Sequence, residues 1–126
     1  MSRIKLTRND TPQIKVVIND EITGAPMDIS GGTVKLRIRA IGSSATLLTL
    51  SGVLLAGLEQ DDGSLNYTYP YSVVGSGGRV AFQFAVGQLS IPAGQYEGEV
   101  ETTTSTGHII TAQNLIKLQV REEFAS

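Results

Sequence analysis

The sequence contains no cysteine and no tryptophan, and its only histidine is His108. Without cysteine, neither disulfides nor thiolate metal sites can stabilise the fold. A histidine with no second histidine and no cysteine supplies neither a zinc site nor a Cys/His nucleophile pair, so we interpret His108 as a turn or strand-start residue. We therefore expect no metal, no cofactor and no catalytic residue, and we expect that the chain is not an enzyme.

Segments with helical periodicity and concentrated positive charge are also lacking. Threonine, valine, isoleucine and glycine are abundant instead, which is typical of strands and turns. The formal net charge is −2, whereas a nucleic-acid partner needs a concentrated basic surface, so we expect no nucleic acid. At 126 residues we expect one domain spanning 1–126, large enough to bury a core.

No export or membrane segment is expected. Arg3 and Lys5 lie where a secretory signal needs an apolar run, so we expect no export signal. The absence of cysteine is compatible with the cytosol or with a particle assembled there. Residues 41–58 carry no charge, but glycine, serine and threonine interrupt them, whereas a spanning helix needs about 20 predominantly apolar residues. Ser51 and Gly52 at the centre of this stretch favour the turn of a hairpin.

Alternation of apolar and polar residues predicts many short strands with turn signals between them. The predicted strands cover residues 3–6, 13–19, 33–40, 64–69, 79–86, 96–102, 108–112 and 115–120. In the strand over 79–86, Val80, Phe82, Phe84 and Val86 are predicted to share the inward face. Short strands at this spacing indicate an all-β sandwich or barrel, and we favour an immunoglobulin-like sandwich of two antiparallel sheets.

The stretch over residues 91–102 is the clearest of these strands. Pro92 cannot donate to a ladder and Gly94 tolerates positive φ, so a turn is predicted before the strand begins. Tyr96 then lies near the start of a late strand, on the inward face. We predict that Tyr96 is a buried corner tyrosine whose hydroxyl bonds to nearby backbone.

Two charged rows of equal length are predicted to face outward. They are the basic row Lys35, Arg37 and Arg39 and the acidic row Glu97, Glu99 and Glu101. A catalytic carboxylate pair needs one desolvated member in a cleft, whereas three carboxylates on an open strand face are typical of a solvated or salt-bridged surface. The two rows are either cross-strand neighbours in one sheet or docking rows that meet their opposites on a neighbouring subunit.

A hairpin from Thr46 to Leu58 is the predicted partner interface. Its apolar residues are Leu47, Leu48, Leu50, Leu54 and Leu55. Because leucines adjacent in sequence point to opposite faces, one face can cover the core while the other leaves an exposed apolar patch. Such patches mark interaction sites, so we expect a homo-oligomer or docking on a partner.

Tyr67, Tyr69 and Tyr71 alternate along the predicted strand over 64–69 and just beyond it. An aromatic strip of this kind can stack on sugars, and this supports an alternative function as a carbohydrate-binding module. Packing at the core and rim of the sandwich explains the three tyrosines equally well.

The order of motifs resembles a family of immunoglobulin-like domains in tailed-bacteriophage virion proteins, including the N-terminal domain of phage baseplate upper proteins. The matching segments are residues 8–11, 24–31, 62–67, 92–100 and 116–124. The resemblance implies a non-enzymatic structural role in the virion, assembled in the host cytoplasm, with other virion proteins as partners. Baseplate upper proteins carry a further fibre-like region, whereas this sequence stops at Ser126. We therefore expect a tail, baseplate or neck adaptor or a head decoration protein.

Overall fold

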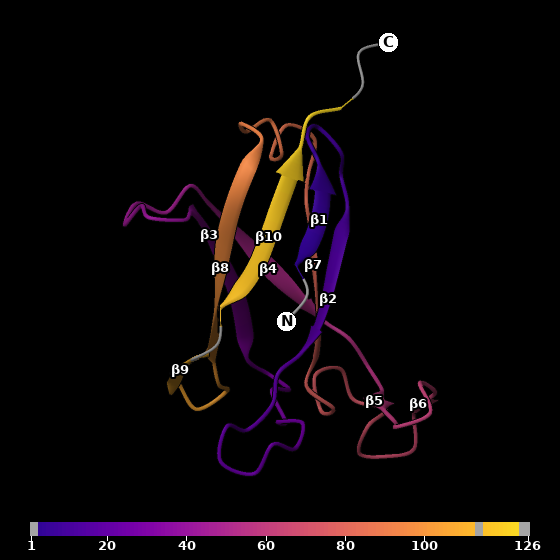
Figure 1. Cartoon of the computed structure of the whole chain (residues 1–126). Coiled ribbons are helices and arrows are strands. Elements are labelled where there is room, and N and C mark those ends of the chain that lie inside the picture. The colour runs from indigo at the N-terminus through magenta and orange to yellow at the C-terminus, as the bar shows by residue number, and fades with distance from the viewer. Residues whose placement is uncertain (1–2, 113–114, 124–126) are drawn as a thin grey trace.

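The computed structural model describes residues 3–112 and 115–123, which form ten strands and no helix (Figure 1). The strands are β1 (Ile4–Thr7), β2 (Gln13–Val17), β3 (Thr33–Ala40), β4 (Leu48–Leu54), β5 (Leu58–Glu59), β6 (Leu65–Asn66), β7 (Arg79–Gln83), β8 (Gly94–Thr103), β9 (Ile109–Thr111) and β10 (Ile116–Arg121). The all-β prediction is therefore confirmed. Met1, Ser2 and Phe124, which belong to the predicted domain, lie outside the described residues.

The strands follow one continuous path of pairing that folds into two layers. Its order is β1-β10-β8-β3-β4-β7-β2, with β9 added beside β8 and with β5 and β6 forming a separate small hairpin. One layer consists of β2, β7 and the second half of β4. The centre of the other layer consists of β3, β8 and β10. This is the strand arrangement of an immunoglobulin-like sandwich, as predicted.

One pair departs from the predicted antiparallel arrangement. β1 runs parallel to β10, with Ile4 opposite Leu118 and Thr7 opposite Arg121. The reason lies in the connection that follows β1, because the chain crosses to β2 in the other layer instead of turning back beside β10. Without a hairpin between them, β1 and β10 are free to run in the same direction.

β4 passes from one layer to the other. Its first half pairs with β3 as far as Ser51, and its second half, from Gly52 onward, pairs with β7. The predicted turn at these two residues is therefore wrong. Glycine is required here for close approach rather than for a turn, because a Cβ on Gly52 would lie 2.5 Å from Cγ2 of Val80 and 3.2 Å from the carbonyl oxygen of Val34.

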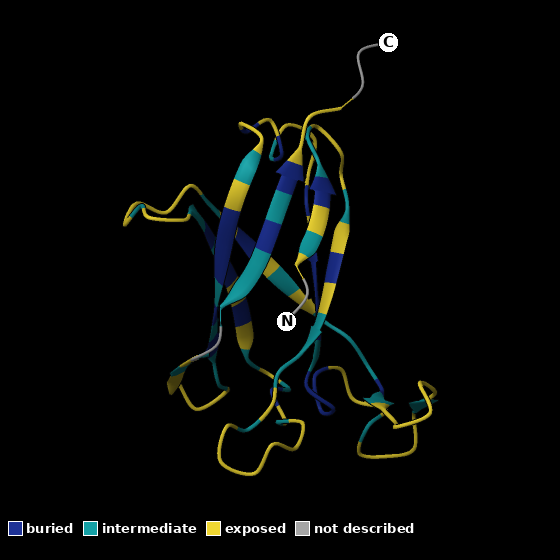
Figure 2. Cartoon of the chain, in the orientation of Figure 1, coloured by how far each residue is buried: buried dark blue, intermediate teal, exposed yellow. Residues whose placement is uncertain are grey.

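The core lies between the two layers and is built from the inward face of every long strand (Figure 2). Its most deeply buried large side chains are Phe82, Phe84, Ile29, Leu36, Ile38, Leu89 and Leu118. Burial of apolar area of this kind contributes about 25 cal/mol per Å² and is the main term that stabilises the sandwich.

The predicted strand over 79–86 ends early. β7 stops at Gln83, and Val86 is 91% exposed instead of facing inward. A turn replaces the last residues, since the Gln88 N–H donates to the Ala85 carbonyl at 3.1 Å and Gly87 has a φ of +86°. This combination is typical of a type II turn, whose third residue has a positive φ and is commonly glycine.

Tyr96 is buried, and its hydroxyl donates to the Pro92 carbonyl oxygen at 2.5 Å. The predicted corner tyrosine is thus confirmed. Burial raises the pKa of the phenol. The positive φ predicted for Gly94 is confirmed at +156°. The predicted turn position is wrong, because Gly94 is the first residue of β8.

Candidate binding groove

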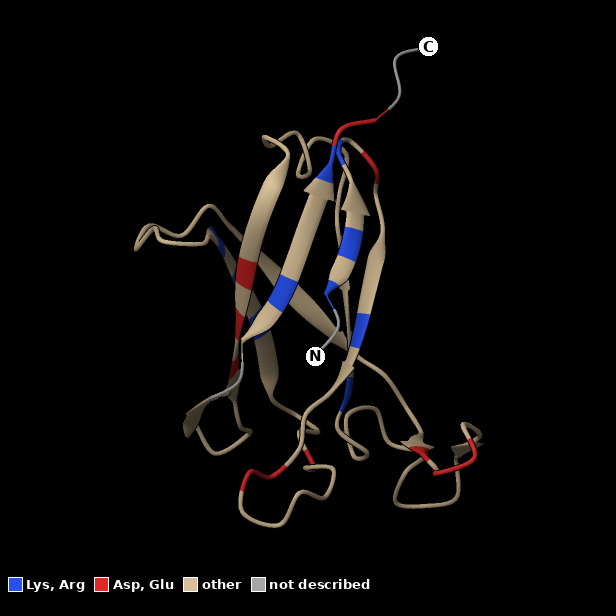
Figure 3. Cartoon of the chain, viewed as in Figure 1, with Lys and Arg blue, Asp and Glu red and all other residues tan. Residues whose placement is uncertain are grey.

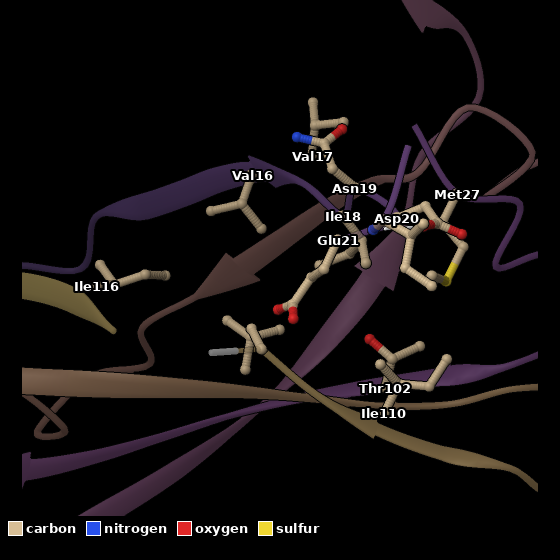
Figure 4. A pocket seen from close by; sticks show the side chains of 13 residues that line it. Val16, Val17, Ile18, Asn19, Asp20, Glu21, Met27, Thr102, Ile110 and Ile116 are labelled. Carbon is tan, nitrogen blue, oxygen red and sulfur yellow. Dashed lines mark hydrogen bonds between the residues drawn. The ribbon is translucent and has the colours of Figure 1, made fainter. Parts of the chain in front are cut away.

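An apolar cavity of about 500 Å³ opens between the end of β2 and strands β8 to β10 (Figure 4). Val16 and Ile18 line one wall, and Val100, Ile110 and Ile116 line the other. Voids inside close-packed cores are rarely larger than a water molecule, whereas a volume of several hundred Å³ is typical of binding sites. We name this cavity the groove.

The groove lies where the two ends of the strand path fail to meet. β1 and β2 are the first and last strands of that path, and they are not paired with each other. β1 begins with Ile4, opposite Leu118, while the groove is lined two residues earlier along β10, at Ile116. β1 therefore covers one part of the opening between the layers, and β2 continues past the start of β1 (Figure 1).

Within the described residues, β2 pairs with β7 along one of its edges only. The Ile18 N–H donates to the Gly78 carbonyl at 2.8 Å, on the side of β7. Because neighbouring residues on an antiparallel strand direct their backbone groups to opposite edges, Val16 and Ile14 also bond toward β7. Lys15 and Val17 consequently direct their N–H and carbonyl groups toward the open edge.

Two carboxylates line the groove where the chain leaves β2, and we call this end of the groove its mouth. Asp20 and Glu21 line it, and Figure 4 shows the Glu21 side chain pointing into the space between the walls. Asp20 also shapes the loop, since its Oδ1 accepts the N–H groups of Ile22 at 2.8 Å and Thr23 at 3.1 Å. The groove therefore combines a mainly apolar lining, a strand edge that pairs with no second described strand, and an acidic mouth.

The predicted leucine interface is not built by the fold. Leu50 is only 3% exposed and belongs to the core, while Leu48 and Leu54 pack against the core. Leu55 is half-buried, and Leu47 is 48% exposed. The physical reason is that β4 is one strand passing between the layers, so its inward side chains face the core along its whole length.

The two charged rows are neighbours in one sheet, which selects the intramolecular alternative (Figure 3). Their register pairs Lys35 with Glu101, Arg37 with Glu99 and Arg39 with Glu97. Side chains are not restricted to these pairs. The ion pairs join Arg39 Nε to Glu97 Oε1 at 2.8 Å, Lys117 Nζ to Glu97 Oε2 at 3.2 Å, and Arg37 Nη1 to Glu101 Oε2 at 2.8 Å.

The acidic row is salt-bridged at Glu97 and Glu101, which is one of the two forms expected, but the row is not open to solvent at Glu97. The Glu97 side chain is only 11% exposed, because Arg39 on β3 and Lys117 on β10 cover it from both sides. Hydrogen bonds from these two cations lower the pKa of Glu97. Arg37 lowers the pKa of Glu101 in the same way. Glu97 and Glu101 are therefore ion-paired carboxylates.

The three tyrosines do not form a strip along one strand. β6 ends at Asn66, before Tyr67, and the bond between Tyr69 and Pro70 is cis. Tyr69 is 80% exposed, whereas Tyr71 is half-buried and sits in a turn. The predicted strand over 64–69 was too long because these residues fold as a loop beside the small β5–β6 hairpin. Sugar binding by these tyrosines stays a prediction.

His108 lies in the turn before β9, as expected. Its N–H donates to Thr104 Oγ1 at 3.1 Å, and its Nδ1 lies 3.1 Å from Thr106 Oγ1. Over residues 3–112 and 115–123, no group of three histidine or acidic side chains could hold a metal ion. The same residues include no apolar helix of the length that a bilayer crossing requires.

No protein-family model matches the chain, and no curated protein matches it. Among solved structures, it is similar to CopC from Methylosinus trichosporium OB3b, at 11% identity and a TM-score of 0.46, over 100% of this chain and 90% of that one. It is also similar to murine CRIg, at 16% identity and a TM-score of 0.41, over 94% and 92% of the two chains. Both TM-scores are below 0.5, so neither likeness carries an argument about function.

The groove was not predicted from the sequence. One signal was present, since Val16, Val17 and Ile18 are consecutive apolar residues and therefore make both faces of the strand apolar. An edge strand that faces water normally alternates instead. The opposite wall could not be foreseen, because it is assembled from three strands far away in the sequence.

Proposed function

We propose that the chain is a non-enzymatic structural component of a tailed-phage virion, acting through protein–protein assembly as a tail, baseplate or neck adaptor or as a head decoration protein. The observation that carries this proposal is the open groove beside the edge of β2 that pairs with no other strand of the described residues. A strand edge and an apolar groove together form a surface that suits another polypeptide.

The resemblance of the motifs adds the virion to this proposal. Several of the matching segments build the turns and corners of the sandwich. The Ser30 N–H donates to Asp28 Oδ1 at 3.0 Å, the Ser64 N–H donates to Asp62 Oδ1 at 2.9 Å, and Tyr96 forms the corner described above. A module with this architecture would dock on other virion proteins, as a homo-oligomer or singly.

The proposal is tested in particles of the phage or prophage that encodes the chain. Virions are purified on a density gradient and probed with an antibody against the protein. We expect the protein to co-sediment with intact particles and to stay with them after a high-salt wash. A protein that remains entirely in the soluble lysate while particles form normally would disprove the virion role.

A glycan array with the purified domain tests the carbohydrate-binding alternative. Binding that Tyr69→Ala abolishes would favour a carbohydrate-binding module over an assembly component. Retention of the protein in washed particles, without sugar affinity, would favour assembly.

A further inference from the structure

We propose that the groove accepts an extended segment of a partner protein, which adds as a strand to the open edge of β2. Its alternate apolar side chains enter the groove, and a basic residue of the segment faces Asp20 and Glu21. This inference rests on the proposed function in assembly and names the chemistry of the partner at the groove.

The backbone of β2 supplies the first requirement. Lys15 and Val17 direct their N–H and carbonyl groups away from β7, as the bond from Ile18 to Gly78 establishes. A strand edge that presents backbone N–H and carbonyl groups in this way is a template for one more strand. Hydrogen bonds to the main chain then give affinity without reading the sequence of the partner.

The groove supplies the second requirement, which is a place for side chains. Side chains on an added strand point alternately toward and away from the core, so every second residue of the segment would meet Val100, Ile110 and Ile116 on the far wall. Apolar side chains at those positions would remove apolar surface from water on both partners. The volume of about 500 Å³ is sufficient for a small number of such side chains.

The acidic mouth supplies the third requirement. Asp20 and Glu21 are two carboxylates adjacent in sequence at one end of the groove. An acidic segment would bring like charges together there, while a lysine or arginine would be attracted. The partner segment is therefore predicted to be extended, apolar at alternate positions and basic at the residue that reaches the mouth.

A second folded copy of this chain fits the groove less well. Its own edge strand could pair with β2, but the inward side chains of that strand are already in its own core, as Ile14 is here. Such a copy would complete the backbone pairing and leave the groove empty. An extended segment satisfies the edge and the groove together.

The probe is a synthetic eight-residue peptide in which valine alternates with threonine, with a lysine at each end so that either orientation brings one lysine to the mouth. Binding to the full chain is measured by titration calorimetry and by amide hydrogen exchange. We expect saturable binding and at least about tenfold slower exchange of the Val17 amide in the complex. A peptide with glutamates in place of the lysines should bind about tenfold more weakly.

Two variants separate the edge from the groove. Val17→Pro removes an N–H that β7 does not use, and proline is tolerated on edge strands, so the fold should persist while peptide binding weakens about tenfold or more. Ala112→Phe fills the groove and leaves the β2 edge intact, and it should abolish binding. The matched control is Val86→Pro, at the second position of the turn from Ala85 to Gln88, where proline is accommodated and binding should be unchanged.

Several results would overturn this proposal. These are a wild-type chain that does not bind the peptide at millimolar concentration, and binding that all three variants retain equally. A dimer that Val17→Pro dissociates, in a chain that ignores the peptide, would assign the edge to a second copy instead. Each result is independent of co-sedimentation with virions, so the proposed function can fail while the groove binds, and the reverse.

Discussion

Gly52 faces Val80 across the point where β4 changes layers, so closely that a Cβ on Gly52 would lie 2.5 Å from Val80 Cγ2. A second close atom, Cε1 of Phe82, would lie 3.0 Å away. Both neighbours are fully buried and packed, so neither can move aside without disturbing the core. The passage of one strand through both layers therefore depends on the absence of a side chain at this position.

The first prediction follows from that contact. Gly52→Ala should destabilise the fold by about 1–3 kcal/mol, which is the usual cost of overpacking a core. Urea unfolding measures the loss. Val80→Ala removes the clashing methyl groups. Gly52→Ala should therefore cost less free energy of unfolding in the Val80→Ala background than in the wild type. Additive losses in this cycle would show that the contact does not limit residue 52.

The second prediction concerns the corner tyrosine. Tyr96→Phe removes the hydroxyl that bonds to Pro92 and should cost about 0.5–1.5 kcal/mol, while Tyr96→Ala should cost about 3–5 kcal/mol because a large buried ring is lost. Denaturant melts of both variants give the two values. A loss below about 1 kcal/mol for Tyr96→Ala would contradict the buried position of the ring.

The third prediction is a pH dependence at Glu97. Arg39 and Lys117 lower its pKa in the folded chain, below the ordinary value of 4.5. A lowered folded pKa means that the ion pairs stabilise the fold fully above the unfolded pKa and that this contribution is lost as pH falls through the folded pKa. The wild type should therefore have a higher melting temperature than the Glu97→Gln variant at pH 6.5. This difference in melting temperature should become smaller as the pH is lowered toward 3.

Thermal melts at several pH values with constant ionic strength measure that difference. Glu122→Gln is the control, because Glu122 forms an exposed ion pair with Arg8 and should change the melting temperature little at any pH. An equal difference between wild type and Glu97→Gln at pH 6.5 and pH 3 would show that its charge does not stabilise the fold.

The fourth prediction tests whether the charged face also docks on a partner. Glu99 lies opposite Arg37 in the register, but the Arg37 guanidinium binds Glu101 instead. Glu99→Lys should therefore change the stability of the isolated domain by no more than about 1 kcal/mol, yet impair assembly into particles. Melting and co-sedimentation with virions are measured on the same variant. Normal assembly at every salt concentration would restrict the charged face to an intramolecular role.

The sequence alone determined the elements whose pattern is local. Strict alternation over 33–40 predicted β3 with both of its ends, and the alternation from Tyr96 to Thr102 predicted the inward face of β8. The position of Tyr96 near the start of a late strand predicted a bond from its hydroxyl to nearby backbone, and the structure identifies the acceptor as Pro92. Side-chain periodicity, proline and glycine act within a few residues of themselves, so these features are legible without knowledge of the rest of the chain.

Only the tertiary structure decided the features that join distant segments. The sequence predicted a turn at Gly52 because glycine occurs both in turns and where neighbouring strands pack closely. Only the contact with β7 in the folded chain distinguishes the two cases. The ion pairs of Glu97 required the registers of β3 and β10 against β8, which no local pattern encodes. The groove exists because β1 does not cover the end of β2. Ile18 and Ile116 line the same cavity only because the two layers bring β2 and β10 close to each other in space.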